Sequence, residues 1–340
     1  MNTGTGTETA AALSAVERGR AFPPTLDVRR PGERRRVCLL GATGTIGSAT
    51  AAALVRQGHD VVCLVRAGAG VGKSRTPAGS TGLFEGVTVK AVDPTDPTAL
   101  ARDGFTGERF DAVVSCMASR TGAPRDAWAI DHRAHLNVLE AAQEAGVGHF
   151  ILLSANCVQK PLLAFQHAKL AFEAAIIDSG MRYSIVRRTA FFRSLSGQIE
   201  RAREGRAFLI FGDGSLTACK PISDGDLGDY IAACLNEDSR WNRILPIGGP
   251  GDAITPRQQG EALFALLGRT PKFRSVPVCL LDVIAGGLAA FSRIAPSLAK
   301  KAELARIGRY YATESMLVLN RAIRQVRRGC YPFDRNRDLV

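Results

Sequence analysis

The stretch Val37-Cys38-Leu39-Leu40-Gly41-Ala42-Thr43-Gly44-Thr45-Ile46-Gly47 decides the fold of this chain. A short apolar run ends in glycines at three-residue spacing and continues into a helix-forming segment, which predicts a strand, a tight turn and a helix. Gly41 permits the turn, Gly44 lets a phosphate approach the backbone, and Gly47 lets the helix pack on its strand. The N–H groups and the positive end of the helix dipole then face an anion. The motif therefore predicts a dinucleotide site, with a purely structural glycine turn as the alternative. The residues expected at the cofactor are Gly41, Thr43, Gly44, Thr45, Ile46 and Gly47.

A second apolar strand, Asp60–Val65, ends at Arg66. An enzyme that reads a ribose 2′-hydroxyl carries an acid at this place, whereas a guanidinium pairs with a 2′-phosphate. Arg66 therefore predicts NADPH as the cofactor, with a plain surface charge as the alternative. The Gly/Ser-rich residues 67–82 that follow are either a flap over the adenosine end of the cofactor or an ordinary surface loop.

Apolar strands and helices alternate along the chain as far as residue 190. The sequence predicts strands at 87–91, 110–116, 149–154 and 183–187, with helices at 132–145 and 163–178. This alternation is typical of an α/β fold with a Rossmann-type, doubly wound parallel sheet. Ligands of such sheets bind beyond the carboxyl ends of the strands, where we expect Asp93, Ser115 and Ser154 to meet the cofactor.

The alternation breaks after residue 190, which suggests a division into parts. We expect a disordered basic tail at 1–35 and an NADP-binding Rossmann domain at 36–190. A small, helix-rich substrate lobe at 191–319 would be interleaved with the last Rossmann elements. An Arg-rich tail at 320–340 would be poorly ordered.

Charge and cysteine content narrow the class of protein. The formal net charge is +12, but the arginines gather in the two tails and no basic-aromatic module is present, so we predict no nucleic-acid partner. The eight cysteines are scattered singly without a Cys-x-x-Cys pair, which favours free thiols in the cytoplasm and no metal site. The apolar segment 276–298 is interrupted by charges, glycines and a proline, so it is no spanning helix. It remains a candidate amphipathic helix that rests on a membrane or on a hydrophobic ligand.

The acid-base residues of the short-chain dehydrogenases are only partly present. Ser154 and Lys169 stand where those enzymes carry a serine and the lysine of Tyr-x-x-x-Lys, but the tyrosine position is Phe165. A phenyl ring donates no proton, so the usual carbonyl chemistry is missing. Lys169 either binds the nicotinamide ribose or is a plain helix-surface lysine.

Several stretches together indicate a family. Residues 154–170, 183–195, 245–251 and 307–317 resemble the divinyl chlorophyllide a 8-vinyl-reductases, which are atypical short-chain dehydrogenases related to the NmrA-like proteins. The resemblance runs from Arg36 to Leu319 and is more specific than the glycine motif alone. It departs from the family at Arg188, where a proline is usual and where we expect little consequence, and in the Arg-rich residues after 319.

The resemblance implies NADPH-dependent reduction of an 8-vinyl group to ethyl in chlorophyll or bacteriochlorophyll biosynthesis. A vinyl group conjugated to a tetrapyrrole accepts hydride without a tyrosine acid, because the macrocycle spreads the negative charge. The proton would come from solvent or from a donor such as Lys160, Cys157 or Tyr310, and we expect Lys160 and Lys169 to be the catalytic residues. The expected substrate contacts are Phe165, Phe191, Phe192, Phe211, Lys220 and Arg193, with core or solvent-facing positions as the alternatives.

Two rival functions share this fold. One is a non-catalytic, NADP(H)-sensing regulator of the NmrA-like type, and the other is an assembly factor for photosynthetic complexes. A reductase would be cytoplasmic, with an expected peripheral contact to the photosynthetic membrane. The sequence leaves open the oligomeric state, the proton donor and the choice between chlorophyllide and protochlorophyllide.

Overall fold

The computed structural model describes residues 33–66, 85–190, 196–291, 299–320 and 325–326. Most of the two predicted tails and the loop at 67–82 lie outside these ranges. Phe191, Phe192 and Arg193 also lie outside them, so their expected substrate contacts stay predictions.

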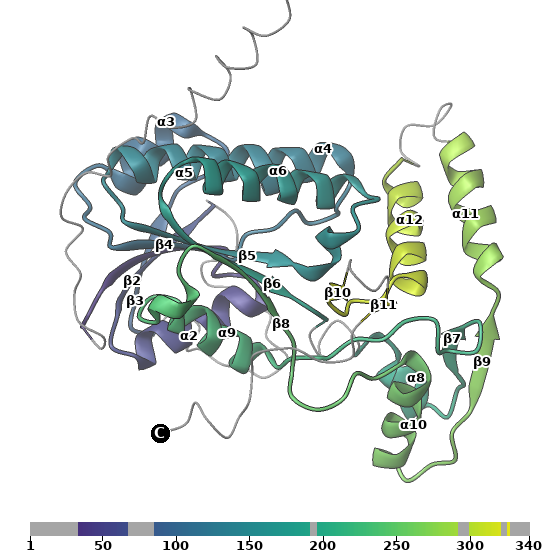
Figure 1. The fold of residues 1–340 in the computed structure, drawn as a ribbon. Coiled ribbons are helices and arrows are strands. Elements are labelled where there is room, and N and C mark those ends of the chain that lie inside the picture. The colour runs from purple at the N-terminus through teal and green to yellow at the C-terminus, as the bar shows by residue number, and fades with distance from the viewer. Residues whose placement is uncertain (1–32, 67–84, 191–195, 292–298, 321–324, 327–340) are drawn as a thin grey trace, which may run out of the picture. The chain divides into compact units, whose positions relative to one another are not determined.

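The predicted parallel sheet is confirmed (Figure 1). Seven strands lie in the order β3-β2-β1-β4-β5-β6-β8, and every neighbouring pair is parallel. Nearly continuous apolar runs build the central strands, because helices cover both faces of a parallel sheet. The strands are β1 (Arg36–Leu40), β2 (Asp60–Val65), β3 (Val87–Ala91), β4 (Ala112–Ser115), β5 (His149–Ala155), β6 (Arg182–Arg188) and β8 (Arg243–Ile247).

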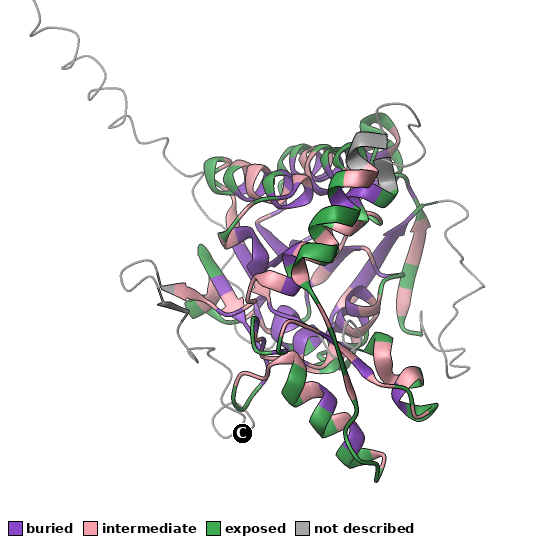
Figure 2. Ribbon diagram, turned by 90° about the vertical axis from the view of Figure 1, so that its right-hand side faces the viewer, coloured by how far each residue is buried: buried purple, intermediate pink, exposed green. Residues whose placement is uncertain are grey.

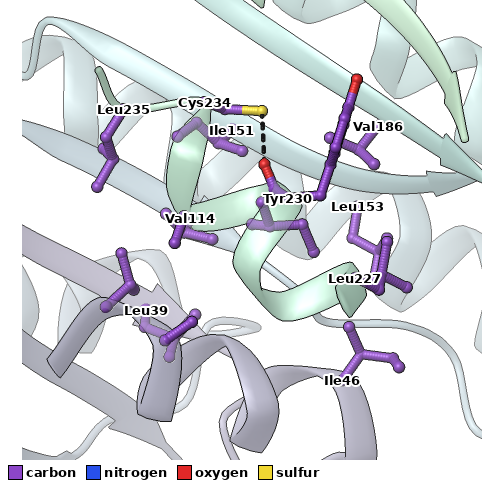
Figure 3. Packing of buried hydrophobic residues seen from close by; sticks show 14 of the residues in the cluster. Leu39, Ile46, Val114, Ile151, Leu153, Val186, Leu227, Tyr230, Cys234 and Leu235 are labelled. Atoms are coloured by element: carbon purple, nitrogen blue, oxygen red, sulfur yellow. Dashed lines mark hydrogen bonds between the residues drawn. The ribbon is translucent and has the colours of Figure 1, made fainter. Parts of the chain in front are cut away.

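Two layers of helices cover the sheet. On one face lie α2 (Thr45–Arg56) and α9 (Asp224–Ala233), and on the other lie α5 (His135–Glu144) and α6 (Ala164–Asp178) (Figure 1). Figure 2 shows the buried strands between helices whose outer faces are exposed. Figure 3 shows α9 directing Leu227 and Tyr230 toward the strands, within one core that also holds Leu39 and Ile151.

The helix predicted at 132–145 begins earlier than the sequence suggested. Pro124 opens α4 (Pro124–Ala127), the π-helical segment η2 (Trp128–Ala134) follows, and α5 continues without a break. The shorter α3 (Pro97–Ala99) likewise runs into the π-helical η1 (Leu100–Phe105). Such wide turns are rare and often occur at functional sites. In this protein η2 carries Asp131, which enters the candidate site described below.

After β6 the chain builds a second small core. The strands β7 (Phe208–Phe211) and β9 (Phe273–Val276) pair in parallel, next to α8 (Ile199–Arg203) and α10 (Pro256–Leu266). Phe208, Ile210 and Phe264 form their buried centre. Because β8 and α9 return to the main sheet, the two sets of elements are interleaved along the chain. That residues 191–319 act as a substrate lobe stays a prediction.

Two long helices follow β9, namely α11 (Val278–Phe291) and α12 (Ala299–Thr313). They pack against each other, and α12 also reaches the main sheet through Ile307 and Tyr310. Among the described residues, no helix combines the length and the apolar character that crossing a membrane requires. The short elements η3 (Asn156–Gln159), η4 (Ser196–Gln198), η5 (Asp238–Arg240), β10 (Leu319–Asn320) and β11 (Gln325–Val326) complete the fold.

The contact between α2 and α9 generates a prediction about stability. A Cβ at Gly228 would lie 2.7 Å from the carbonyl carbon of Ala49, whereas a Cβ at the exposed Gly225 meets nothing closer than 3.9 Å. Gly228→Ala should therefore lower the free energy of unfolding by about 1–3 kcal/mol through overpacking. Gly225→Ala, the matched change in the same helix, should be neutral or stabilising by up to about 1 kcal/mol. Denaturant unfolding measures both, and equal effects would contradict a close approach at Gly228.

Candidate functional site

The glycine turn after β1 has the geometry that the motif predicted. Gly41 has φ +78°, and a Cβ on it would lie 2.6 Å from the carbonyl carbon of Cys116. A Cβ at Gly47 would lie only 2.0 Å from the carbonyl oxygen of Gly41, which the Gly44 N–H also reaches at 3.0 Å. The roles of Gly41 in the turn and of Gly47 in helix packing are therefore confirmed.

The N-terminus of α2 is arranged to receive an anion. Gly44 is its N-cap, and no side chain caps the first turn. The first N–H groups of a helix have no partner within the helix, so a phosphate supplies the acceptor that a capping side chain otherwise provides. The residues fit a dinucleotide pyrophosphate, which Gly41, Thr43, Gly44, Thr45, Ile46 and Gly47 would hold. Their individual contacts with the cofactor stay predictions.

Arg66 and Asp93 lie at the carboxyl ends of β2 and β3, as predicted. Arg66 is exposed directly after β2. Burial acts to raise the pKa of Asp126, but hydrogen bonds from Thr121 and the positive charge of Arg66 hold that pKa below its usual value. Asp93 is exposed, and its carboxylate accepts hydrogen bonds from the backbone N–H and hydroxyl of Thr95. The contact of Arg66 with a cofactor phosphate stays a prediction, and Asp93 stabilises a local turn.

Ser115 is completely buried and is used within the protein. Its hydroxyl lies 2.9 Å from Nε2 of His135, whose Nδ1 lies 2.7 Å from the carbonyl oxygen of Ile130. The carbonyl can only accept, so Nδ1 donates to it and Nε2 accepts from the serine. Burial and the charge of Lys169 lower the pKa of His135 to about 4, which keeps the ring neutral. Ser115 thus fixes the carboxyl end of β4 against His135. Its contact with the cofactor ribose stays a prediction.

Ser154 is also buried, in a separate polar network. Its hydroxyl donates to Glu173, and the same carboxylate forms an ion pair with Arg187. The Arg187 Nε lies 3.1 Å from Oε2 of Glu173. The network ties α6 to the ends of β5 and β6. A role for Ser154 at the cofactor stays a prediction, since its hydroxyl already donates to an internal carboxylate.

Lys169 is not a plain surface lysine, so that alternative is wrong. Its side chain is 12% exposed, and its Nζ lies 2.9 Å from Oδ1 of the fully buried Asp131. The Ser119 N–H donates to the same oxygen, while Oδ2 of Asp131 has no partner in the structure. The cation therefore stands beside a carboxylate with unused accepting capacity, close to the carboxyl ends of the central strands. A polar group such as a ribose hydroxyl matches this arrangement.

Phe165 lies in a cluster with Leu163, Ala168 and Tyr310, and it packs next to Ile307 of α12. It is only 9% exposed. The structure thus supports the interpretation of Phe165 as a core residue that joins α6 to α12. Its contact with substrate stays a prediction.

The three predicted proton donors differ sharply in their surroundings. Nζ of Lys160 is exposed and lies 2.6 Å from Glu314. The hydroxyl of the buried Tyr310 donates a hydrogen bond shared between the carbonyl oxygens of Cys157, at 2.9 Å, and Lys160, at 3.1 Å. Burial raises the pKa of Tyr310 to about 12. Cys157 is buried after β5, and its Sγ lies 3.8 Å from the hydroxyl of Tyr311.

Sequence reasoning missed two residues at this edge of the sheet. Tyr311 sits on α12, far along the chain from Cys157, and Arg188 ends β6 where little consequence was expected. Burial lowers the pKa of Arg188, while the neighbouring Tyr311, Cys157, Asp224 and Cys116 act in the opposite direction. Burial also raises the pKa of Cys116 to about 12. The departure from the family pattern at Arg188 was the signal that could have drawn attention to this cluster.

A mostly apolar cavity of about 290 Å³ lies beside the cluster. Residues of η4, β7, α10 and α12 line it, including Phe208, Ile210, Phe211 and Tyr311. Phe211 therefore lines a cavity, and its contact with substrate stays a prediction. Lys220 is half-buried beside Gly248 and does not line this cavity, so its contact with a substrate carboxylate stays a prediction.

Metal binding and disulfide formation find no support in the described part of the chain. It contains no group of three His, Cys, Asp or Glu residues placed to hold a metal ion. All seven cysteines described there have free thiols.

The buried pair of Lys169 and Asp131 generates a stability prediction. Lys169→Ala leaves a buried carboxylate without its cation, which should lower the free energy of unfolding by roughly 3–5 kcal/mol. Adding Asp131→Ala should restore much of this loss, because the uncompensated charge is then removed. A double-mutant cycle by denaturant unfolding measures the coupling. Additive effects of the two changes would contradict the ion pair.

Comparisons with known proteins give the family. Residues 41–238 match the NAD(P)H-binding family. The chain is 45% identical to the chloroplastic divinyl chlorophyllide a 8-vinyl-reductase of Zea mays, over 85% of this chain and 74% of the relative. It is also 45% identical to the Arabidopsis thaliana protein of the same name, over 84% and 70%. The structure of the NADPH-dependent quinone oxidoreductase QOR2 of Escherichia coli, complexed with NADPH, shares the fold with a TM-score of 0.58 at 20% identity, over 80% of this chain and 90% of that one. The chain therefore belongs to the divinyl chlorophyllide a 8-vinyl-reductase family of NAD(P)H-binding proteins.

Proposed function

We propose that this protein reduces the 8-vinyl group of divinyl chlorophyllide, or of its protochlorophyllide precursor, to an ethyl group with NADPH. The observation that carries the proposal is the 45% identity to reductases of that name over most of both chains. The uncapped N-terminus of α2 and its glycine turn support a bound dinucleotide. Phe165 in the tyrosine position supports a reaction on a carbon–carbon double bond rather than on a carbonyl.

The position of each residue in the fold then gives it a role in binding the cofactor or the substrate. NADPH supplies a hydride when bound. The turn at Gly41–Gly47 binds its pyrophosphate, Arg66 binds its 2′-phosphate, and Lys169 orients its nicotinamide ribose. The cavity walled by Phe208, Ile210 and Phe211 receives an apolar edge of the tetrapyrrole. Positioning the reduced cofactor against the vinyl group provides most of the catalytic effect, because the macrocycle spreads the developing charge.

The site favours the reductase over the two rival functions. A regulator that senses NADP(H) needs the nucleotide site but no apolar cavity between β7, α10 and α12. An assembly factor on this fold needs neither a hydride donor nor a walled cavity. The exposed apolar side chains Leu280, Val283 and Ile284 of α11 agree with a peripheral membrane contact, which stays a prediction.

Anaerobic incubation with divinyl chlorophyllide and NADPH tests the proposal. We expect conversion to the monovinyl pigment, followed by chromatography and absorption, with one NADPH oxidised for each vinyl group reduced. A parallel binding measurement with NADPH establishes that the protein is competent. Tight NADPH binding without any pigment conversion would refute the reductase and favour a sensor.

Arg66 generates a prediction about cofactor choice. Removing a charge-assisted contact costs about 1.5–3 kcal/mol, so Arg66→Ala should weaken NADPH binding roughly 10- to 100-fold. Binding of NADH, which lacks the 2′-phosphate, should change little. Arg203→Ala, which removes another exposed arginine charge, is the matched control and should affect neither cofactor. Titration calorimetry measures the affinities of the wild type and both variants for the two cofactors, and equal weakening of both cofactors by Arg66→Ala would remove the case for a 2′-phosphate contact.

A further inference from the structure

Reduction of a vinyl group needs a proton as well as a hydride. The candidate proton donors differ in how they are placed relative to the cavity. This inference rests on the proposed function. Lys160 is poorly placed, because its ammonium group is exposed and pairs with Glu314. Tyr310 is 4% exposed, and its hydroxyl is held by two backbone carbonyls. Both of these predicted donors have structural partners that keep them away from the cavity.

Tyr311, the next residue of α12, is placed differently. Tyr311 lines the apolar cavity together with Phe208, Ile210 and Phe211, and 40% of its surface is exposed. Its hydroxyl lies 3.8 Å from Sγ of Cys157, directly beyond the carboxyl end of β5. Cofactors of doubly wound sheets bind along this edge. One side chain therefore spans the distance between the cavity and the edge where the cofactor binds.

Arg188 gives the Tyr311 hydroxyl a charged neighbour. The two groups interact electrostatically, and the guanidinium acts to lower the pKa of Tyr311, although burial of the hydroxyl raises it overall. The phenol is therefore protonated at neutral pH, as a proton donor must be. A positive charge nearby stabilises the phenolate that remains after the proton has left.

We propose that Tyr311 is the proton donor of the vinyl reduction, with Arg188 stabilising its phenolate and Cys157 positioning its hydroxyl. Hydride from NADPH forms a C–H bond at the terminal vinyl carbon, and the π electron pair moves to the inner carbon and into the macrocycle. That pair takes the phenolic proton, which breaks the Tyr311 O–H bond and completes the ethyl group. The phenolate then recovers a proton from water. The balance is one vinyl group, one NADPH and one proton converted to one ethyl group and NADP⁺.

The test compares two adjacent tyrosines. General acid catalysis contributes about 10²–10⁴-fold, so Tyr311→Phe should lower kcat by at least roughly a hundredfold. The Kd for NADPH and the Tm should stay near the wild-type values. Tyr310→Phe is the matched control: it loses a hydrogen bond to the backbone, so its Tm should fall while kcat changes only a few-fold.

Isotope effects distinguish a proton donor from a structural residue. In Tyr311→Phe the proton transfer becomes rate-limiting, so the solvent deuterium isotope effect on kcat should rise. The primary effect with deuterated NADPH should shrink. A Tyr311→Phe enzyme with wild-type kcat and isotope effects would overturn the assignment while leaving the reductase intact. Failure of the wild type to convert the pigment would instead refute the proposed function, and this inference with it.

Discussion

The site depends on one constraint, which is the close packing of the glycine turn against the chain directly after β4. Gly41 stands so near Cys116 that a side chain there would displace the chain after β4. Gly47 sits equally close to the carbonyl oxygen of Gly41, and Gly228 brings α9 against the backbone of α2. The orientation of α2, and hence the direction of its N–H groups, is set by backbone contacts at several points along its length. A phosphate site of this kind is preorganised, because no side chain has to move to open it.

Buried polar networks hold the other strand ends in place. Ser115 is bound to His135, Ser154 to Glu173, which also pairs with Arg187, and Lys169 to Asp131. The first two networks join strand ends to α5 and α6, and the third joins α6 to η2. Buried polar groups are costly unless they are satisfied, so such pairs strongly disfavour alternative arrangements of these loops. These contacts fix the loops at the carboxyl edge of the sheet, where Phe165 fills the tyrosine position of the short-chain dehydrogenases.

The helix α12 connects this platform to the apolar cavity. Its two consecutive tyrosines serve different ends, because residues next to each other on a helix point in different directions. Tyr310 faces the backbone after β5 and anchors the helix, while Tyr311 lines the cavity. Leu280, Val283 and Ile284 of α11 are exposed, and the helix packs against α12. Through Tyr310 and Tyr311, α12 therefore contacts both the chain after β5 and the apolar cavity.

Whereas the order of the strands in the sheet came from the structure, the sequence by itself determined the parallel α/β class of the nucleotide domain, the glycine turn, the place of Arg66 and the family. These features are local, because glycine spacing, apolar periodicity and residue type at a strand end need no knowledge of distant partners. Only the tertiary structure decided that Ser115 and Ser154 turn into internal networks, and that Lys169 is buried beside Asp131. Only the structure also showed that Tyr311 lies beside Cys157 and that Arg188 interacts with both of these residues. The physical reason is that hydrogen bonds and ion pairs between residues far apart in the chain depend on how helices pack, which no local pattern records.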